Sequence, residues 1–120
     1  MDDLDQYVKS FVRIQASNEC KIKYKRLEND TFEFFIQTSI NIETFIPERI
    51  EDKITKISIE FIDNSNINSI DISNIRSCKS LVISGDTFSV LTIHGNDVVT
   101  MLDISKLECE KLYLRQFSNL

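Results

Sequence analysis

Residues 78–98 decide the fold, and they read CKSLVISGDTFSVLTIHGNDV. The stretch holds two copies of a pattern in which the first, fourth and sixth residues are apolar, and the copies begin at Cys78 and Phe88. The same pattern begins at four further positions, Ile54, Ile67, Val99 and Cys109. From Ile67 onward longer and shorter steps alternate, so that Ile67, Phe88 and Cys109 are equally spaced. The repeat unit is therefore about 21 residues long and carries two short strands.

This pattern predicts a short β-solenoid, in which the chain winds into stacked coils. The fourth and sixth residues of each segment point into the coil, and the residue between them points out. Stacking buries the inward side chains of neighbouring coils against one another, while backbone hydrogen bonds run from coil to coil. Because three such units barely suffice for a core, we expect the ends of the stack to need a cover.

An antiparallel β meander or sandwich is the alternative fold. Residues 84–87 and 94–97 are good tight-turn sequences, each with glycine at a position that a type II′ hairpin prefers. Short strands at this regular spacing, with turns between them, also fit such a fold. We favour the solenoid because the pattern recurs in segments that have no glycine turn.

Residues 88–98 also fit the pattern L-x-x-L-x-L-x-x-N-x-L, with Asn96 in the asparagine position. Over about residues 46–120 the chain therefore resembles leucine-rich-repeat proteins. The resemblance implies parallel coils and an asparagine amide buried against loop backbone. Other copies have Ile75, Leu107 or Phe117 at that position, so most of the asparagine ladder is missing. Strand signals on both halves of the unit look more like short bacterial or viral variants than the horseshoe with helices outside.

The first part of the chain contains ordinary elements that would cover one end of the stack. Apolar residues at helical spacing predict a helix over residues 4–14, and alternation predicts strands over 20–25 and 31–36 joined by a turn at 28–30. Pro47 marks the boundary between the two parts. We predict an α+β, mostly β fold of one domain, residues 1–120, in which residues 1–46 form a helix and small sheet that cap the repeat region, residues 47–120.

Composition narrows the class of protein. The 120 residues include 18 Ile but one Ala, which favours β structure over a helical bundle, and the net charge is -5. No apolar run is long enough to cross a bilayer, and the negative charge disfavours nucleic-acid binding. Three cysteines with no close pair favour a reduced, cytoplasmic protein. The bias toward Ile, Asn, Ser and Lys is typical of an AT-rich source such as a phage, a large DNA virus or a low-GC bacterium.

The sequence predicts no catalytic constellation, no metal site and no cofactor. His94 is the single histidine, and Cys78 and Cys109 occupy inward positions that suit buried thiols. Two series of outward residues are better candidates for a function. The first, which we predict as the binding surface, is Asp71, Ser73, Thr92, His94, Tyr113 and Arg115; the second is Ser58, Glu60, Val82, Ser84, Asp103 and Ser105. A row of Lys21, Lys23 and Lys25 could also line a polyanion, although solvent-facing strand positions are commonly charged.

These features favour a non-enzymatic module that binds a protein partner through one sheet face, as mixed aromatic and charged surfaces often do. A more specific hypothesis is a small acidic inhibitor or immunity protein of phage or viral origin, which neutralises a basic toxin or defence factor. A small enzyme built around His94 is a third, weaker hypothesis. The exposed edge at the C-terminal end offers a further expectation, self-association.

Overall fold

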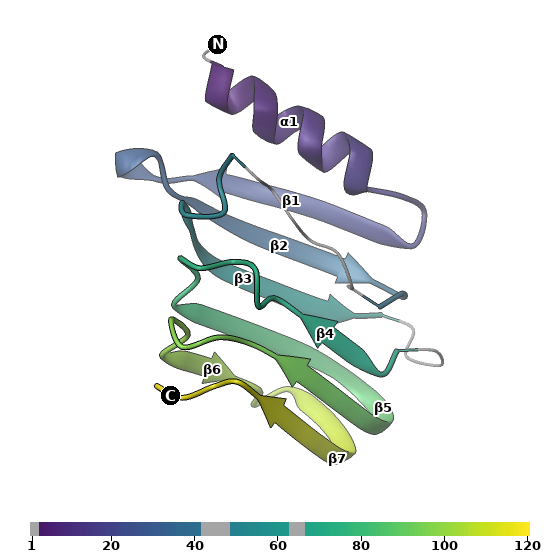
Figure 1. The fold of residues 1–120 in the computed structure, drawn as a ribbon. Helices are drawn as coiled ribbons and strands as arrows, with labels where there is room; N and C mark the ends of the chain where they lie inside the picture. The colour runs from purple at the N-terminus through teal and green to yellow at the C-terminus, as the bar shows by residue number, and fades with distance from the viewer. Residues whose placement is uncertain (1–2, 42–48, 63–66) are drawn as a thin grey trace.

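The computed structural model describes residues 3–41, 49–62 and 67–120, and it contains one helix followed by seven strands (Figure 1). The helix is α1 (Asp3–Gln15), and a short 3-10 turn, η1 (Glu28–Asp30), lies between the first two strands. The strands are β1 (Cys20–Arg26), β2 (Phe32–Thr38), β3 (Ile54–Phe61), β4 (Ser69–Asp71), β5 (Ser80–His94), β6 (Met101–Asp103) and β7 (Leu107–Arg115). The predicted class, mostly β with one N-terminal helix, is confirmed.

The strands form two sheets. Sheet A has the order β1-β2-β3-β5-β6, and sheet B has the order β4-β5-β7, so β5 belongs to both. Of these strands, β1 and β2 pair antiparallel, and the other pairings are parallel. The parallel pairings exclude the meander and confirm a solenoid-like arrangement of about three coils. We call them coil 1 (β3 and β4), coil 2 (β5) and coil 3 (β6 and β7).

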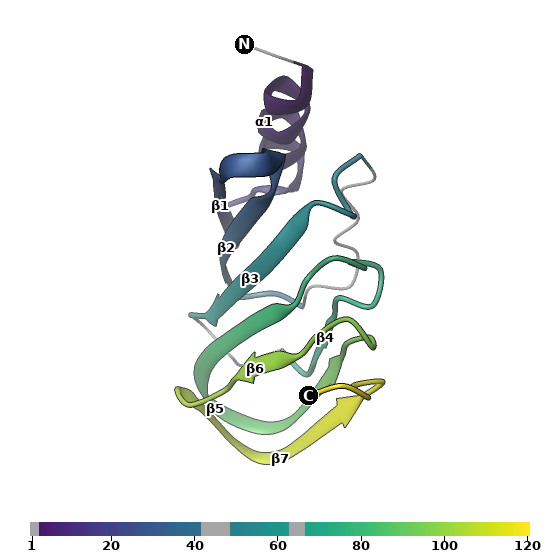
Figure 2. The same cartoon turned by 90° about the vertical axis from the view of Figure 1, so that its left-hand side faces the viewer.

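Strand β5 is one continuous strand that bends round from sheet A into sheet B, so that its second half runs back in the opposite direction to its first half (Figure 2). Gly85 lies where it bends, with φ of +143°, a conformation that L side chains rarely adopt. A Cβ there would also lie 3.0 Å from the Cβ of Phe61. The glycine that suggested a hairpin turn therefore makes a corner within one coil.

Inward side chains of successive coils stack directly on each other. In sheet A, Ile57 pairs with Leu81 and Leu81 with Leu102; in sheet B, Leu91 pairs with Leu112. Every first, fourth and sixth residue of the four segments from residue 54 to residue 93 is buried. This burial supplies the main hydrophobic stabilisation of the stack.

The spacing between coils is less regular than the sequence suggested. Leu102 follows its partner Leu81 by one repeat unit, as expected, but Leu81 follows its partner Ile57 by more than one unit. In sheet B, Ile70 pairs with Ile93 and not with Leu91, the residue at the same place in the sequence repeat. Coil 1 is thus longer than the unit, and its extra residues shift the register by two positions.

Asn96 is a polar residue of the repeat pattern that is buried like a core residue, with 4% of its surface exposed. Its Nδ2 donates to the carbonyl oxygens of Ser73 at 3.2 Å and Ile75 at 3.0 Å, both in the preceding turn. Its Oδ1 accepts a hydrogen bond from the backbone N–H of Val98. Ile75, at the corresponding position of the preceding copy, is fully buried and fills the same place with an apolar side chain.

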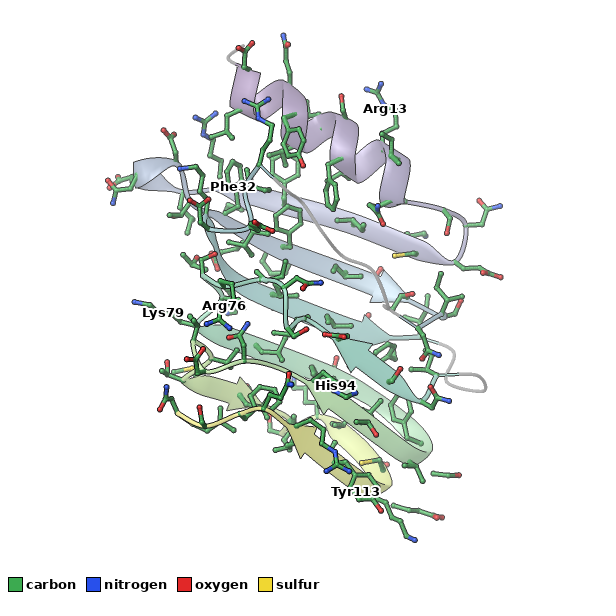
Figure 3. The ribbon with its side chains drawn as sticks, in the orientation of Figure 1. Arg13, Phe32, Arg76, Lys79, His94 and Tyr113 are labelled. Carbon is green, nitrogen blue, oxygen red and sulfur yellow. The ribbon has the colours of Figure 1, made fainter. Side chains whose placement is uncertain are left out.

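Helix α1 and the β1–β2 hairpin close the N-terminal end of the stack, as predicted. Val8 and Phe11 are buried, and the Phe11 ring meets the Phe34 ring of β2 edge-on, with the centroids 6.5 Å apart. The Tyr24 hydroxyl of β1 donates to Asp5 of the helix at 3.3 Å. Phe32 lies on β2, at the end of the sheet nearest the helix (Figure 3). The buried residues of the helix, the hairpin and the coils form one hydrophobic core.

The predicted boundary at residues 46–47 lies outside the described residues. Among the residues that are described, no helix is long and apolar enough to cross a membrane.

Candidate functional site

The outer face of sheet B carries the predicted binding residues in two rows. Ser69, Thr92 and Tyr113 are cross-strand partners on β4, β5 and β7, and Asp71, His94 and Arg115 form the next row. The parallel register thus brings five of the six predicted residues onto adjacent rungs. This placement agrees with the predicted arrangement, while binding by these residues stays a prediction.

Ser73, the sixth predicted residue, lies two residues after the end of β4 and is hydrogen-bonded to Asp71, the last residue of that strand. Its hydroxyl and backbone N–H donate to Oδ1 of Asp71 at 2.6 and 2.9 Å. Asp103 and Ser105 of coil 3 repeat the arrangement, with the corresponding distances 2.7 and 3.0 Å. Hydrogen bonds from Ser105 hold the pKa of Asp103 below its usual value. Both Asp-Ile-Ser sequences therefore lock the chain where a short strand ends, which is a structural use of these carboxylates.

Tyr113 is the most prominent aromatic residue of this face, with 42% of its surface exposed. The Arg115 guanidinium carbon lies 5.4 Å from the centre of its ring, within cation–π range. Figure 3 shows His94 and Tyr113 on neighbouring strands of sheet B. An exposed tyrosine and arginine side by side are typical of contact surfaces between proteins.

His94 has few partners for chemistry. Asp71 and Arg115 flank it on the neighbouring strands, but Asp103, which could have approached it, pairs with Val82 in sheet A. Among the described residues, no three His, Cys, Asp or Glu side chains gather as metal ligands would. Within the same residues, the geometry offers His94 no orienting carboxylate hydrogen bond of the kind that general bases use.

The outer face of sheet A carries the second series and is wider. One row across it consists of Lys23, Phe35, Ser58, Val82 and Asp103, each paired with the next. The neighbouring row consists of Lys21, Gln37, Glu60 and Ser84.

Except for Asp103, the residues of these two rows line a hollow of about 420 Å³. Phe35 lies in it with 43% of its surface exposed, and Val82 is half-buried beside it. Lys21 and Lys23 border the hollow on β1, and neither ammonium forms an ion pair within the described part of the chain. Glu60 borders it on β3, where its Oε1 accepts a hydrogen bond from Gln37 Nε2 at 2.7 Å. The hollow thus combines two apolar side chains with ammonium groups at its β1 side and a carboxylate on β3, between the strands of Phe35 and Val82.

Sequence reasoning missed Phe35 as a surface residue. A strand with one buried face alternates apolar and polar residues, but residues 34–36 are all apolar. Phe34 and Ile36 are buried, so Phe35 must point outward. This break in the alternation is the signal that could have identified the hollow.

Two of the three cysteines are buried, and none forms a disulfide. Burial raises the pKa of the Cys78 thiol to about 11, and its Sγ donates to the carbonyl oxygen of Ser80. Cys78 is therefore a core residue held in the unreactive thiol form.

Comparisons with models of known families, with curated proteins and with solved structures found no match for this chain. The family resemblance seen in the sequence therefore stays an expectation, and the two outer faces are the features of the molecule that bear on function.

Proposed function

We propose that the protein is a non-enzymatic module that binds a protein partner through the outer face of sheet A. The observation that carries the proposal is the hollow around Phe35. Large exposed aromatic side chains on an otherwise polar surface are enriched in protein interfaces, and the strongest contributions to binding come from aromatic residues in pockets.

The chemistry of the hollow suggests what the partner presents. An apolar side chain of the partner would pack on Phe35 and Val82, which would remove their exposed surface from water. An acidic group would find the ammonium groups of Lys21 and Lys23 at the β1 side, and a basic group would find Glu60 two strands away on β3. This arrangement fixes the orientation of the partner as well as its position.

The outer face of sheet B is the second candidate surface, with Tyr113 on its edge strand β7. It is three strands wide, whereas sheet A is five strands wide. A stable interface usually covers roughly 800 Å² on each partner, so the wider and hollowed face is the better fit.

The experiment compares three forms of the protein in affinity capture from the organism that encodes it. We expect Phe35→Ser to lose a partner that the wild type retains, because the substitution removes an apolar side chain of the hollow. Tyr113→Ser is the matched control, since Tyr113 is exposed to the same extent but lies on sheet B. The captured partner is then purified, and its affinity for each form is measured by calorimetry.

A loss of about tenfold or more in affinity for Phe35→Ser, with Tyr113→Ser unchanged, supports the proposal. The reverse pattern would assign binding to the predicted residues of sheet B, and equal affinity of all three forms would contradict binding through either aromatic residue.

A steep loss of affinity with rising salt would point to the narrower proposal, an acidic inhibitor of a basic partner, which rests on the net charge of -5. The two lysines at the hollow favour the broader proposal, because a surface built to attract basic partners would be acidic throughout.

A further inference from the structure

Coil 3 is the open end of the solenoid. Leu81 and Ile93 of coil 2 are fully buried, but their stacking partners in coil 3 are not: Leu102 is half-buried, and Leu114 is 40% exposed. Met101 is also 63% exposed. The inward side chains of this coil have a neighbouring coil on one side and solvent on the other.

Strand β7 has a free edge along this open end. Within the described part of the chain it pairs with β5 alone, whereas β5 has β4 on its other side. Its nine residues make it the longest strand after β5. Free edges of long strands are templates for pairing with another strand.

The charges along β7 are ordered by sign. Glu108 and Glu110 lie in the first half, and Lys111 and Arg115 lie in the second half, all of them exposed. Residues 101–120 carry three acidic and three basic side chains, so this end is neutral although the whole chain has a charge of -5. If two copies of β7 pair antiparallel, the acidic half of each faces the basic half of the other.

We infer that the open end is an interface between two copies of this chain, which pair through antiparallel β7 strands into one continuous sheet B. The pairing satisfies the free backbone groups of both edges and places the exposed Leu114 side chains of the two copies in a shared apolar layer. A two-fold axis relates the two copies, so both β7 edges are used in the contact and the assembly is a dimer. The other end cannot extend the assembly, because α1 and the lysine-bearing β1 cover it.

The test uses charge reversal on exposed positions, measured by sedimentation under a reducing agent. We expect the wild type to show a concentration-dependent monomer–dimer equilibrium. Glu108→Lys with Glu110→Lys makes the strand wholly basic, and Lys111→Glu with Arg115→Glu makes it wholly acidic. Each double variant should weaken the dimer by roughly tenfold or more, because like charges then face each other.

Two further samples separate pairing from damage to the fold. An equimolar mixture of the two double variants should form a heterodimer, and the chain that carries all four reversals should recover the homodimer, since opposite charges again face each other. Lys79→Glu, a reversal at an exposed position before β5, is the control and should leave the dimer unchanged.

A wild type that stays monomeric up to about 1 mM would overturn the inference. So would a dimer that all the reversals leave intact, or one that the mixture and the fourfold reversal fail to restore. Phe35→Ser should dimerise as the wild type does, so the outcome is independent of the function proposed for sheet A.

Discussion

Replacing Asn96 by alanine tests whether one buried amide ties coil 2 to the turn before it. Asn96→Ala removes the donor to the carbonyl oxygens of Ser73 and Ile75 and the acceptor for the Val98 N–H. Each net hydrogen bond of this kind contributes about 1 kcal/mol, and a buried group left without a partner costs about 1–3 kcal/mol. Because Ser73 is half-exposed and water can reach it, we expect a total loss of about 2–3 kcal/mol.

Urea unfolding followed by circular dichroism measures this loss. With a denaturant slope of about 1–3 kcal/mol per molar, the midpoint should fall by roughly 0.7–3 M. Asn119→Ala is the matched control, because its Nδ2 also donates to a backbone carbonyl, that of Asp97, but at an exposed site. It should change the free energy of unfolding by less than about 0.5 kcal/mol.

The variant Asn96→Asp extends the same experiment to the dependence of stability on pH. An ionised carboxylate cannot donate to the two carbonyl oxygens, so at neutral pH this variant should be less stable than Asn96→Ala. Burial and the two carbonyls raise the pKa of the introduced carboxyl above its unfolded value, which is about 4. The neutral form therefore favours the folded state, and the gap between the variants should narrow as the pH falls from 7 toward 4. Equal losses for Asn96→Ala and Asn119→Ala would refute the reasoning.

Three further predictions concern packing and thiol chemistry. A Cβ on Gly95 would overlap the Phe117 ring, so Gly95→Ala should cost about 1–3 kcal/mol, and far less in a Phe117→Ala background. A double-mutant cycle without coupling would contradict this contact. Leu81→Ala should lower the free energy of unfolding in urea by about 2–5 kcal/mol, and Leu102→Ala should lower it clearly less, because Leu81 is fully buried and Leu102 is half-buried. Equal losses would mean that the inward side chains of coil 3 are covered as fully as those of coil 2. Cys78 should resist alkylation in the folded protein, and rapid labelling at pH 8 would contradict its burial. Since burial raises its pKa to about 11, the free energy of unfolding should fall as the pH rises from about 9 to 11, and it should fall more than in Cys78→Ala.

The elements and the solenoid could be predicted because each depends on local pattern. Helical spacing predicted α1 to within a residue or two, and the recurrent apolar triplet identified the inward side chains of the coils. The resemblance that named Asn96 also indicated its burial, which the structure confirms.

The features that could not be predicted from the sequence depend on how the strands pair in the tertiary structure. Gly85 suits a hairpin turn and a corner equally well, and only the parallel pairing of β5 decides between them. The length of coil 1 determines that Ile70 pairs with Ile93, and the apolar pattern of the repeat does not indicate that length. The hollow needs residues from four strands, Lys23, Phe35, Ser58 and Val82, which are neighbours only after the sheet has formed.

The order of pairing along the chain has a consequence for how the protein acquires its structure. The β1–β2 hairpin closes across short sequence separations, whereas every later strand described must find a partner that lies far from it along the chain. Loop closure over such distances is entropically costly unless a template already exists. We therefore expect the helix and hairpin to nucleate folding and the coils to add one after another toward the C-terminal end. During synthesis on the ribosome the template emerges first, so each new coil meets a formed edge as soon as it is made.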